Sequence, residues 1–406
     1  MKKEIQVLIL CLIIISITII YISNSKPHLY TKNTDNLNDL AFYVETEEGS
    51  KVYDSVDQLP GKNDGYIFKK AVCDEDAELI FDNNEWVIYI SNMKNNSTKC
   101  KLYFDKNNTI AKNYILSQNT VNENIPNFKQ VATTNEGIFM AEDNSGTSYY
   151  YRGAVDNNYF YFAGYYWRII RINGDGSIRI IYDGTSTHSN GEKNTDRYLK
   201  AGYYNNATNN NAYVGYRYTL NELHGTSTSS TVEETLNDFY KNHLWEYDEY
   251  ISDTGFCNDR DVSSGSGIGT TATNYAGYNR LVTNKNPTLK CSKESDTFGV
   301  NIGNAILTYP IGLITADEAV LAGGVYGNAN NSYYLYIGYW YFTMTPFQYN
   351  ATNSQAFLFN IGSTGYINSG YTNNSGYIKP VININKNVEL EGDGTANNPY
   401  KIVSNS

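Results

Sequence analysis

The 406-residue sequence contains little proline, cysteine or tryptophan, with 8, 5 and 4 of each. Basic residues are also few: Lys and Arg total 31 against 42 Asp and Glu, so the formal net charge is −11. Binding of nucleic-acid phosphates requires clustered Lys and Arg side chains. The deficit of positive charge therefore argues against nucleic acid as a partner.

The sequence lacks the short motifs that mark common catalytic and metal sites. It has no Gly-x-Ser-x-Gly nucleophile elbow and no C-x-x-C pair. An EF-hand loop beginning at Asn173 fails, since Ile178 occupies the position that requires Gly. We therefore predict no catalytic residue, no metal site and no cofactor. The four histidines are far apart and are interpreted as solvent-exposed: His28, His188, His224 and His243.

Long apolar runs are also absent, except at the N-terminus. Lys2 and Lys3 precede an uncharged, apolar run over residues 7–22. A helix of this length spans about 24 Å, slightly less than a bilayer core of about 30 Å. We interpret residues 1–25 as an uncleaved signal anchor that crosses the cell membrane once, through residues 5–22, with the rest of the chain outside. The alternative is a cleaved signal peptide, after which the protein would be secreted.

Four of the five cysteines lie beyond the apolar run, in two pairs that are local in sequence. In an oxidising compartment they predict two disulfides, and the local connectivity joins Cys73 to Cys100 and Cys257 to Cys291. Free buried thiols are the alternative, and zinc is disfavoured because no His lies near the four cysteines. The paired cysteines favour export independently of the apolar run.

Tyrosine and glycine are abundant, with 39 and 32 residues, and Asn occurs in runs. This composition is typical of short strands and tight turns, because Asn and Gly tolerate left-handed backbone conformations. After a polar stalk over residues 26–40, we predict a small all-β sandwich over 41–105. A linker over 106–136 leads to a larger α+β domain over 137–403. The predicted fold class is α+β, dominated by strands.

Local patterns define several elements of the larger domain. Two β-branched runs over residues 165–172 and 178–182 flank Asn-Gly-Asp-Gly, which predicts a hairpin. Two capping boxes, Thr-Val-Glu-Glu and Thr-Ala-Asp-Glu, predict helices over 231–252 and 315–323.

A series of segments carries a resemblance to known proteins. It comprises YWRIIRINGDGSIRIIYDG, FCNDRD, TLKC, YPIGLITADEAVLAGG, YWYFTMTP, GYIKPVININ and GTANNPYKIV. In this order they resemble a group of uncharacterised surface proteins of low-GC Gram-positive bacteria. The upstream GYIFKKAVC…W…CKLYFD resembles the small β module that precedes the larger domain in that group. The resemblance covers roughly residues 41–403 and implies no established activity.

The C-terminal half is also distantly similar to the C-type-lectin-like and formylglycine-generating-enzyme superfamily. The resemblance implies that residues 315–323 form the helix of that fold, that Trp340 is its core aromatic, and that residues 381–384 form its closing strand. The Glu-Pro-Asn and Trp-Asn-Asp signatures of calcium-dependent sugar binding are absent, as is the close Cys pair that carries copper. The resemblance therefore implies a lectin-like fold without either chemistry.

The surplus of aromatic residues is the remaining functional signal. Tyrosine presents an apolar face with a polar tip, which suits interfaces and stacking on sugars. The alternative is that Tyr replaces Phe and Leu in half-buried strands. We expect a non-enzymatic surface protein that binds or adheres through its lectin-like ectodomain to a glycan, cell-wall or protein ligand. The candidate binding residues are Trp167, Tyr334, Tyr336, Trp340 and Tyr349.

Two other functions are open. The first is an exported enzyme acting on glycans, with Asp259 or Asp261 involved, because glycoside hydrolysis uses a pair of carboxylates. Two carboxylates this close in sequence more simply form a local ion pair with Arg260 or an Asx turn. The second is a structural subunit of the envelope or of a pilus-like fibre.

Overall fold

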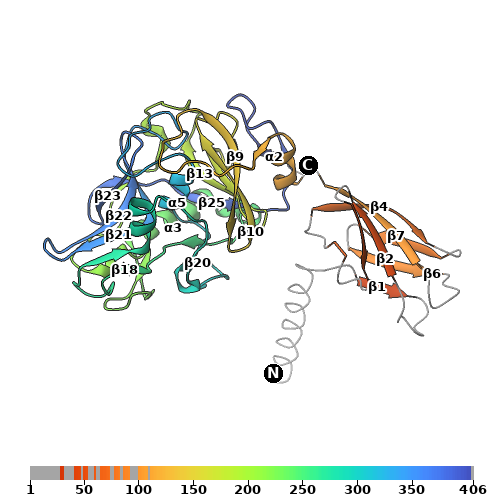
Figure 1. Cartoon of the computed structure of the whole chain (residues 1–406), viewed down its shortest axis with the longest axis horizontal. Helices are drawn as coiled ribbons and strands as arrows, with labels where there is room; N and C mark the ends of the chain where they lie inside the picture. The colour runs from red at the N-terminus through yellow and green to blue at the C-terminus, as the bar shows by residue number, and fades with distance from the viewer. Residues whose placement is uncertain are drawn as a thin grey trace, which may run out of the picture. The chain divides into compact units, whose positions relative to one another are not determined.

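The computed structural model describes residues 28–31, 41–46, 49–53, 59–60, 65–73, 77–82, 86–91, 99–107 and 110–403. The predicted signal anchor over residues 1–25 lies outside these residues. No helix within the described ranges has the length and apolar character needed to cross a bilayer. The chain divides into two compact units, Met1–Asn113 and Tyr114–Ser406, and strands dominate both (Figure 1). The predicted strand-dominated α+β class is confirmed.

The first unit contains two small sheets (Figure 1). The three-stranded sheet has the order β1-β6-β5, comprising β1 (His28–Thr31), β6 (Val87–Ser91) and β5 (Glu78–Asp82). The four-stranded sheet has the order β3-β2-β7-β4, comprising β3 (Gly49–Tyr53), β2 (Ala41–Thr46), β7 (Lys99–Lys106) and β4 (Tyr66–Cys73).

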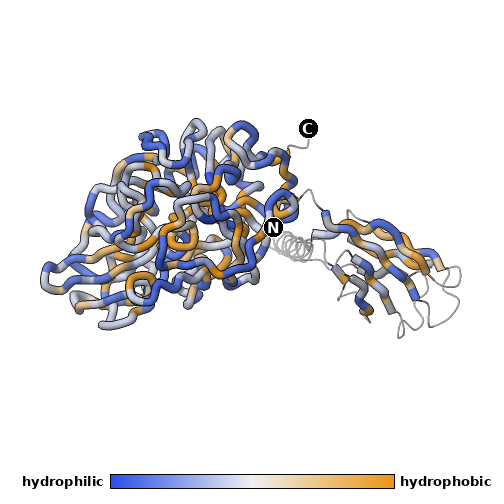
Figure 2. The backbone as a smooth tube through the Cα atoms, turned by 45° about the horizontal axis from the view of Figure 1, so that its top comes forward, coloured by the Kyte–Doolittle hydropathy of each residue, from blue (hydrophilic) through white to orange (hydrophobic). Residues whose placement is uncertain are grey.

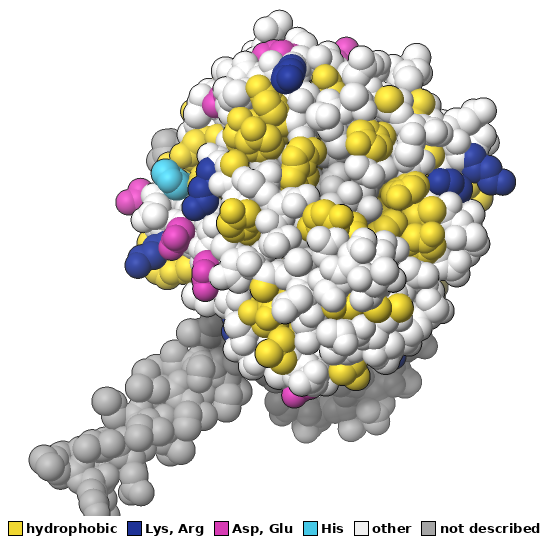
Figure 3. All heavy atoms as spheres, turned by 90° about the vertical axis from the view of Figure 1, so that its left-hand side faces the viewer, with side chains coloured by type: hydrophobic (Ala, Val, Ile, Leu, Met, Phe, Trp, Pro, Cys, Tyr) yellow, Lys and Arg dark blue, Asp and Glu magenta, His cyan; other side chains and the backbone are white. Residues whose placement is uncertain are grey.

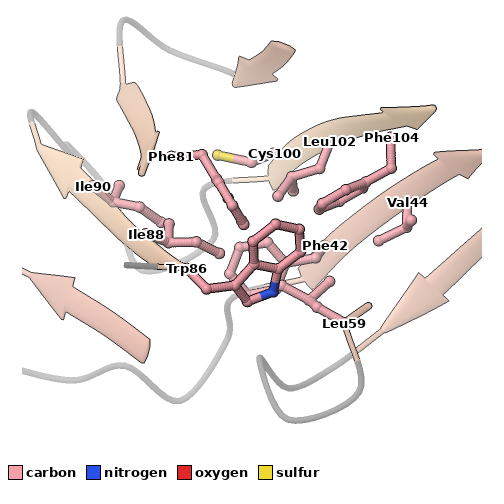
Figure 4. Close-up of a cluster of buried hydrophobic side chains, with 10 residues drawn as sticks. All are labelled: Phe42, Val44, Leu59, Phe81, Trp86, Ile88, Ile90, Cys100, Leu102 and Phe104. Carbon is pink, nitrogen blue, oxygen red and sulfur yellow. The ribbon is translucent and has the colours of Figure 1, made fainter. Parts of the chain in front are cut away.

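A cluster of buried side chains forms the core of this unit (Figure 4). Cys100, Leu102 and Phe104 of β7 all contribute to it, because alternate residues of a strand face the same side of a sheet. The Trp86 ring packs edge-on against Phe81 at 4.9 Å, and its Nε1 donates to the carbonyl of Pro60 at 2.9 Å. Because both sheets contribute to one core, the arrangement is a β-sandwich.

The second unit contains two seven-stranded sheets. The first has the order β25-β13-β12-β10-β9-β8, with β11 paired to β12. Its strands are β8 (Val121–Asn122), β9 (Asn135–Asp143), β10 (Gly146–Gly153), β11 (Tyr159–Phe162), β12 (Tyr165–Ile172), β13 (Ile178–Gly184) and β25 (Val381–Ile384). The predicted hairpin is formed by β12 and β13, and the Asn173 amide donates to the carbonyl of Ser177 at 2.8 Å across its turn.

The second of these sheets has the order β14-β24-β21-β19-β18, with β22 beside β21 and β23 beside β22. Its strands are β14 (Ala201–Gly202), β18 (Val262–Ser264), β19 (Thr273–Tyr275), β21 (Tyr341–Asn350), β22 (Gln355–Ile361), β23 (Ile367–Tyr371) and β24 (Gly376–Tyr377). Three short pairs complete the strands: β15 (Arg217–Tyr218) with β16 (Thr228–Ser229), β17 (Phe256–Cys257) with β20 (Thr297–Phe298), and β26 (Leu390–Glu391) with β27 (Lys401–Ile402). Hydrophobic segments run through the interior of the unit (Figure 2).

The helices of the described residues are short. They are α2 (Ala111–Ser117), α3 (Thr231–His243), α4 (Ala276–Tyr278), α5 (Ala316–Leu321), a π-helix η5 (Asn279–Thr283) and the 3₁₀ turns η2 (Thr195–Arg197), η3 (Asn211–Val214), η4 (Trp245–Tyr250) and η6 (Glu294–Asp296).

The two predicted capping boxes differ in outcome. Thr315 and Glu318 form a complete capping box at the start of α5, as predicted. Helix α3 is instead capped by Ser230, whose side chain accepts a hydrogen bond from the Glu233 amide. It ends at His243 rather than near residue 252, because the chain continues after Leu244 as the 3₁₀ turn η4.

Part of the predicted linker over residues 106–136 is instead integrated into the second unit. Strand β8 pairs with β9, so it belongs to the first seven-stranded sheet. The guanidinium of Arg152 donates to the carbonyls of Asn127 and Gln130 at 3.5 and 3.4 Å, and Ala132 is buried. These contacts hold the later part of the segment against the domain.

Candidate functional site

The five aromatic residues predicted to bind a ligand do not form one exposed site. Trp167, Tyr334 and Tyr349 are 0, 1 and 2% exposed, so they belong to the core. Tyr336 and Trp340 are partly buried. None of the five lines either of the two cavities described below.

The three buried residues have structural roles instead. The Trp167 indole Nε1 donates to the carbonyl of Phe162 at 3.1 Å, and the Tyr334 ring lies 5.5 Å from the buried guanidinium of Arg168. The Tyr349 hydroxyl donates to the carbonyl of Asn209 at 3.1 Å. All three side chains are therefore part of the core of the second unit.

A groove of about 510 Å³ lies between α3 and the segment that begins with η2. We call it the aromatic groove. Helix α3 contributes one wall, the first residues of β12 and the later part of β13 contribute the floor, and residues 195–200 contribute the other wall. Its lining residues are Tyr165, Tyr182, Thr195, Asp196, Tyr198, Leu199, Lys200, Thr235, Asp238, Phe239, Asn242 and His243.

The α3 wall follows from helical periodicity. Its five lining residues recur at spacings of three and four, and such residues share one face of a helix. Val232, Leu236 and Tyr240 are buried and hold the adjacent face of α3 against the core. The sequence of α3 therefore both anchors the helix and presents a separate polar and aromatic stripe: Thr235, Asp238, Phe239, Asn242 and His243.

Three aromatic rings form the floor of the groove. Tyr165 lies 5.5 Å from Tyr182 and 5.8 Å from Phe239, measured between ring centroids. The Tyr165 hydroxyl lies 3.0 Å from Nδ1 of His243. Burial raises the pKa of both tyrosine hydroxyls, so they remain protonated at neutral pH. The floor is therefore uncharged, and its accessible ring surface belongs to the partly exposed Tyr165, because Tyr182 and Phe239 are buried.

Tyr198 provides the aromatic surface of the opposite wall. Its ring lies 4.0 Å from that of Tyr377, and burial raises the pKa of Tyr198 to about 12. The wall is fixed by the buried Arg197, whose Nε donates to Asp183 at 2.9 Å on β13. Its guanidinium also donates to the carbonyl of Tyr336 at 3.0 Å. These contacts tie η2 to the first seven-stranded sheet of the second unit.

The edge of the groove carries polar side chains without protein partners. Within the described part of the chain, the side chains of Asp238, Asn242 and Lys200 make no hydrogen bond or ion pair, and Asp238 and Asn242 are exposed. They remain available to a ligand. One carboxylate and one ammonium at the edge leave it without a strong net charge.

His188 lies beneath this wall and is buried, with 2% exposure, so its predicted exposure is wrong. Nδ1 lies 2.9 Å from Glu192, and Nε2 lies 3.1 Å from Asp196. The hydrogen bond from His188 lowers the pKa of Glu192. Burial opposes ionisation of Asp196, but hydrogen bonds from Thr185 and His188 lower its pKa. These partners satisfy the imidazole locally and make its burial possible.

Ser186 is not an activated nucleophile in this arrangement. Its hydroxyl lies 3.4 Å from Nε2 of His188, but Asp196 is nearer to the same nitrogen, at 3.1 Å. A catalytic His must accept the hydroxyl proton at that nitrogen. Of the other histidines, His243 is exposed at the groove, and His224 is partly exposed beside Asp296.

A second cavity, of about 360 Å³, borders α5 and the Cys257–Cys291 disulfide. We call it the ionic cavity. Arg171 bonds Asp143 at 2.8 Å and Glu318 at 2.9 Å, and Arg179 lies 2.6 Å from Glu318. Arg280 lies 2.9 Å from Asp259 and 2.7 Å from Asp317. The buried charges of this cavity are therefore paired with one another.

Asp259 and Asp261 do not form the predicted ion pair with Arg260. Arg260 instead bonds Asp296 at 2.8 Å. Asp259 is 6% exposed and lines the ionic cavity, where burial raises its pKa against the opposing effect of Arg280. The Ser292 hydroxyl donates to Asp261 at 2.6 Å and to Asp259 at 3.3 Å. These carboxylates thus meet at one hydroxyl beside a cavity, and not on a flat turn.

Both predicted disulfides are present, Cys73–Cys100 and Cys257–Cys291, and they are consistent with an extracellular protein. In the described ranges no group of three or more His, Cys, Asp or Glu residues is placed to hold a metal ion. On one face of the molecule hydrophobic side chains appear in several separate groups, with few charged side chains between them (Figure 3).

The two cavities differ in what they offer a ligand. The ionic cavity contains charges that already neutralise one another, whereas the aromatic groove combines accessible ring surface with unpartnered hydrogen-bonding groups. A cavity with aromatic lining and a few convergent polar groups is the usual form of a small-molecule site. The aromatic groove is therefore the stronger candidate. Comparison of the chain with models of protein families, with curated proteins and with solved structures finds no match.

Proposed function

We propose that the protein is a membrane-anchored surface protein that binds carbohydrate, without chemical turnover, through the aromatic groove of a lectin-like domain. The observation that carries the proposal is the meeting of three aromatic floor residues with unpartnered polar side chains in one groove. The disulfides support an extracellular setting for this binding. Adhesion to a glycan of a host, a neighbouring cell or the cell wall would follow from it.

The chemistry of a sugar matches the two kinds of surface. A pyranose ring has an apolar face of C–H groups, which stacks on Tyr or Phe, and edges of hydroxyl groups, which need hydrogen-bond partners. Tyr165 and Tyr198 supply ring surface, and Asp238 and Asn242 supply an acceptor and an amide. The groove volume of about 510 Å³ lies within the ~300–1,000 Å³ usual for small-ligand sites.

A glycan microarray probed with purified full-length protein tests the proposal. The protein is held in a detergent without a sugar headgroup, since a glycoside detergent would compete for the groove. We expect binding to a subset of glycans, and a loss of affinity of about tenfold or more for Asp238→Ala and Asn242→Ala. Glu234→Ala is the matched control, because Glu234 is an exposed acid of α3 outside the groove.

The stability of the variants must stay constant for the comparison to be informative. Asp238 and Asn242 are exposed and lack protein partners among the described residues, so their replacement leaves the melting temperature within a degree or two. Absence of glycan binding by the wild-type protein, or equal binding by Asp238→Ala, Asn242→Ala and Glu234→Ala, would refute the proposal.

One observation favours a second candidate, an exported enzyme acting on glycans. Asp259 is a carboxyl group with a raised pKa that lines the ionic cavity, as a general acid would. Its ion pair with Arg280, at 2.9 Å, opposes that role by stabilising the ionised form. Release of reducing ends from cell-wall polysaccharide, abolished in Asp259→Asn, would establish the enzyme. Equal release by the wild type and by Asp259→Asn would exclude Asp259 as the general acid.

A further inference from the structure

Further aromatic side chains lie beyond both ends of the aromatic groove. At one end, Tyr198 contacts Tyr377 at 4.0 Å, and Tyr377 in turn lies 5.1 Å from Tyr339. Both neighbours are partly exposed. The side-chain amine of Lys193 lies 4.8 Å above the Tyr339 ring. This end of the surface therefore has ring faces and a polar group, as the groove does.

At the other end, the rings lead from the floor toward η4. Phe162 of β11 lies directly opposite Tyr165 of β12 in the antiparallel register, so the two side chains share one face of the sheet. Tyr247 of η4 packs on Phe162 at 5.5 Å and is 37% exposed. The exposed Tyr247 is therefore connected to Tyr165 through the buried ring of Phe162.

We infer that the aromatic groove is the centre of a longer binding track, and that its ligand is an uncharged oligosaccharide chain of several sugar units. The inference rests on the proposed carbohydrate binding and adds the class of glycan. The track comprises Tyr339, Tyr377, Tyr198, Tyr165 and Tyr247, with Phe162 as the buried link. A single terminal sugar would occupy only the groove. A longer oligosaccharide would also contact the aromatic rings beyond the ends of the groove.

The charges along the track determine the class of sugar. Asp238, Asp196 and Lys200 line the groove, and Lys193 lies over Tyr339. Carboxylates and ammonium groups are mixed along the track, and the whole chain carries a formal charge of −11. The net negative charge of the chain would repel a polyanionic glycan or a teichoic-acid phosphate. Uncharged sugars, including N-acetylated ones, avoid that repulsion.

Calorimetric titration of the full-length protein with oligomers of one to six units tests the inference. The probes are β-1,4-linked glucose and N-acetylglucosamine series, together with any uncharged glycan that binds on the array. We expect the association constant to rise by about tenfold or more between the monosaccharide and the tetrasaccharide and then level off. Equal affinity for one and six units would overturn the inference while leaving the groove as a site for one sugar.

Variants at the two ends of the track separate it from the groove. Tyr377→Ala and Tyr247→Ala should lower affinity for the hexasaccharide by about fivefold or more and change disaccharide affinity by less than about twofold. Asp238→Ala should lower the affinity for oligosaccharides of every length. Tyr161→Ala is the control, because Tyr161 is 38% exposed on the opposite face of β11 from Phe162.

The outcomes distinguish the track from the proposed function. Length-dependent binding that the end variants reduce only for long oligomers supports the track. End variants that weaken short and long oligomers alike overturn it, since the outer rings would then act through folding or through the groove. Absence of binding at every length, and on the array, overturns carbohydrate binding itself. Preference for polyanionic glycans overturns the assignment of an uncharged ligand.

Discussion

Replacement of Glu318 by Gln tests whether the ion network beside α5 holds the second unit together. Glu318 is 3% exposed; one oxygen accepts from Arg171 Nε at 2.9 Å, and the other accepts from the Thr315 amide at 2.9 Å. Burial opposes its ionisation, but Arg179 and Arg171 hold its pKa below the ordinary value. Arg171 also has Asp143 as a partner, whereas Arg179 pairs with no other carboxylate in the described residues.

The expected loss of stability in Glu318→Gln follows from this difference between Arg171 and Arg179. The contact of 2.6 Å between Arg179 Nε and Glu318 is an ion contact without hydrogen-bond geometry, so it depends on the charge that Gln lacks. Removal of one partner of a buried ion pair costs about 3–5 kcal/mol, because the other charge remains buried. The exposed pair Lys69–Asp105 provides the contrast: Asp105→Asn should cost less than about 1 kcal/mol.

Urea denaturation, followed by tryptophan fluorescence and far-ultraviolet circular dichroism, measures both losses. Trp86 is the only tryptophan of the first unit, so a Trp86→Phe background makes the fluorescence report the second unit alone. With a urea dependence of about 3 kcal/mol per molar, the Glu318→Gln midpoint should fall by about 1–2 M. A loss as small as that of Asp105→Asn would mean that the buried network contributes no more than a surface pair.

Three further predictions concern buried groups. Burial lowers the pKa of Lys379 to about 7, so above pH 7 the unfolded chain binds its proton more tightly than the folded chain and stability rises with pH. From pH 7 to 9 the unfolding free energy of the wild type should rise relative to Lys379→Met by up to about 1.4 kcal/mol per pH unit; parallel urea-titration results for the two proteins would contradict this. Replacement of Cys257 and Cys291 by Ser opens a loop with a sequence separation of 34 and should cost about 3–4 kcal/mol, which an unchanged melting temperature would exclude. His188→Gln removes the hydrogen bond that lowers the pKa of Glu192, so carboxyl NMR should find that pKa shifted upward; no shift would mean that the contact is not kept in solution.

The elements that the sequence predicted well are those with local chemical signals. The hairpin of β12 and β13 was predictable because two β-branched runs flank a turn rich in Asn and Gly. The cap of α5 was predictable because Thr315 and Glu318 satisfy each other's backbone amides. The end of α3 at His243 was not, since the apolar pattern continues through Tyr247 while the chain passes from an α-helix into the 3₁₀ turn η4.

The candidate site could be predicted only in part. The helical spacing of the α3 lining residues was visible in the sequence, but the groove also needs residues of β12, β13 and the segment 195–200. Exposure of individual aromatics could not be judged from composition, because this chain uses Tyr inside its core. Fully buried examples with at most 1% exposure are Tyr204, Tyr216, Tyr240, Tyr275 and Tyr333. Trp167 and Tyr334 belong with them, which is why their predicted role in binding is not supported.

In α3, the residues that anchor the helix are different from the exposed polar residues that line the groove. This difference is the strongest physical argument for a ligand at the aromatic groove. Val232, Leu236 and Tyr240 anchor the helix, so Asp238 and Asn242 are not needed to hold it. Apolar surface left in water is less favourable than buried surface by roughly 25 cal/mol per Å². Exposure of the Tyr165 and Tyr198 rings is therefore unfavourable in free energy. A bound sugar face would cover that surface, and its hydroxyls would meet the unpartnered groups at the edge.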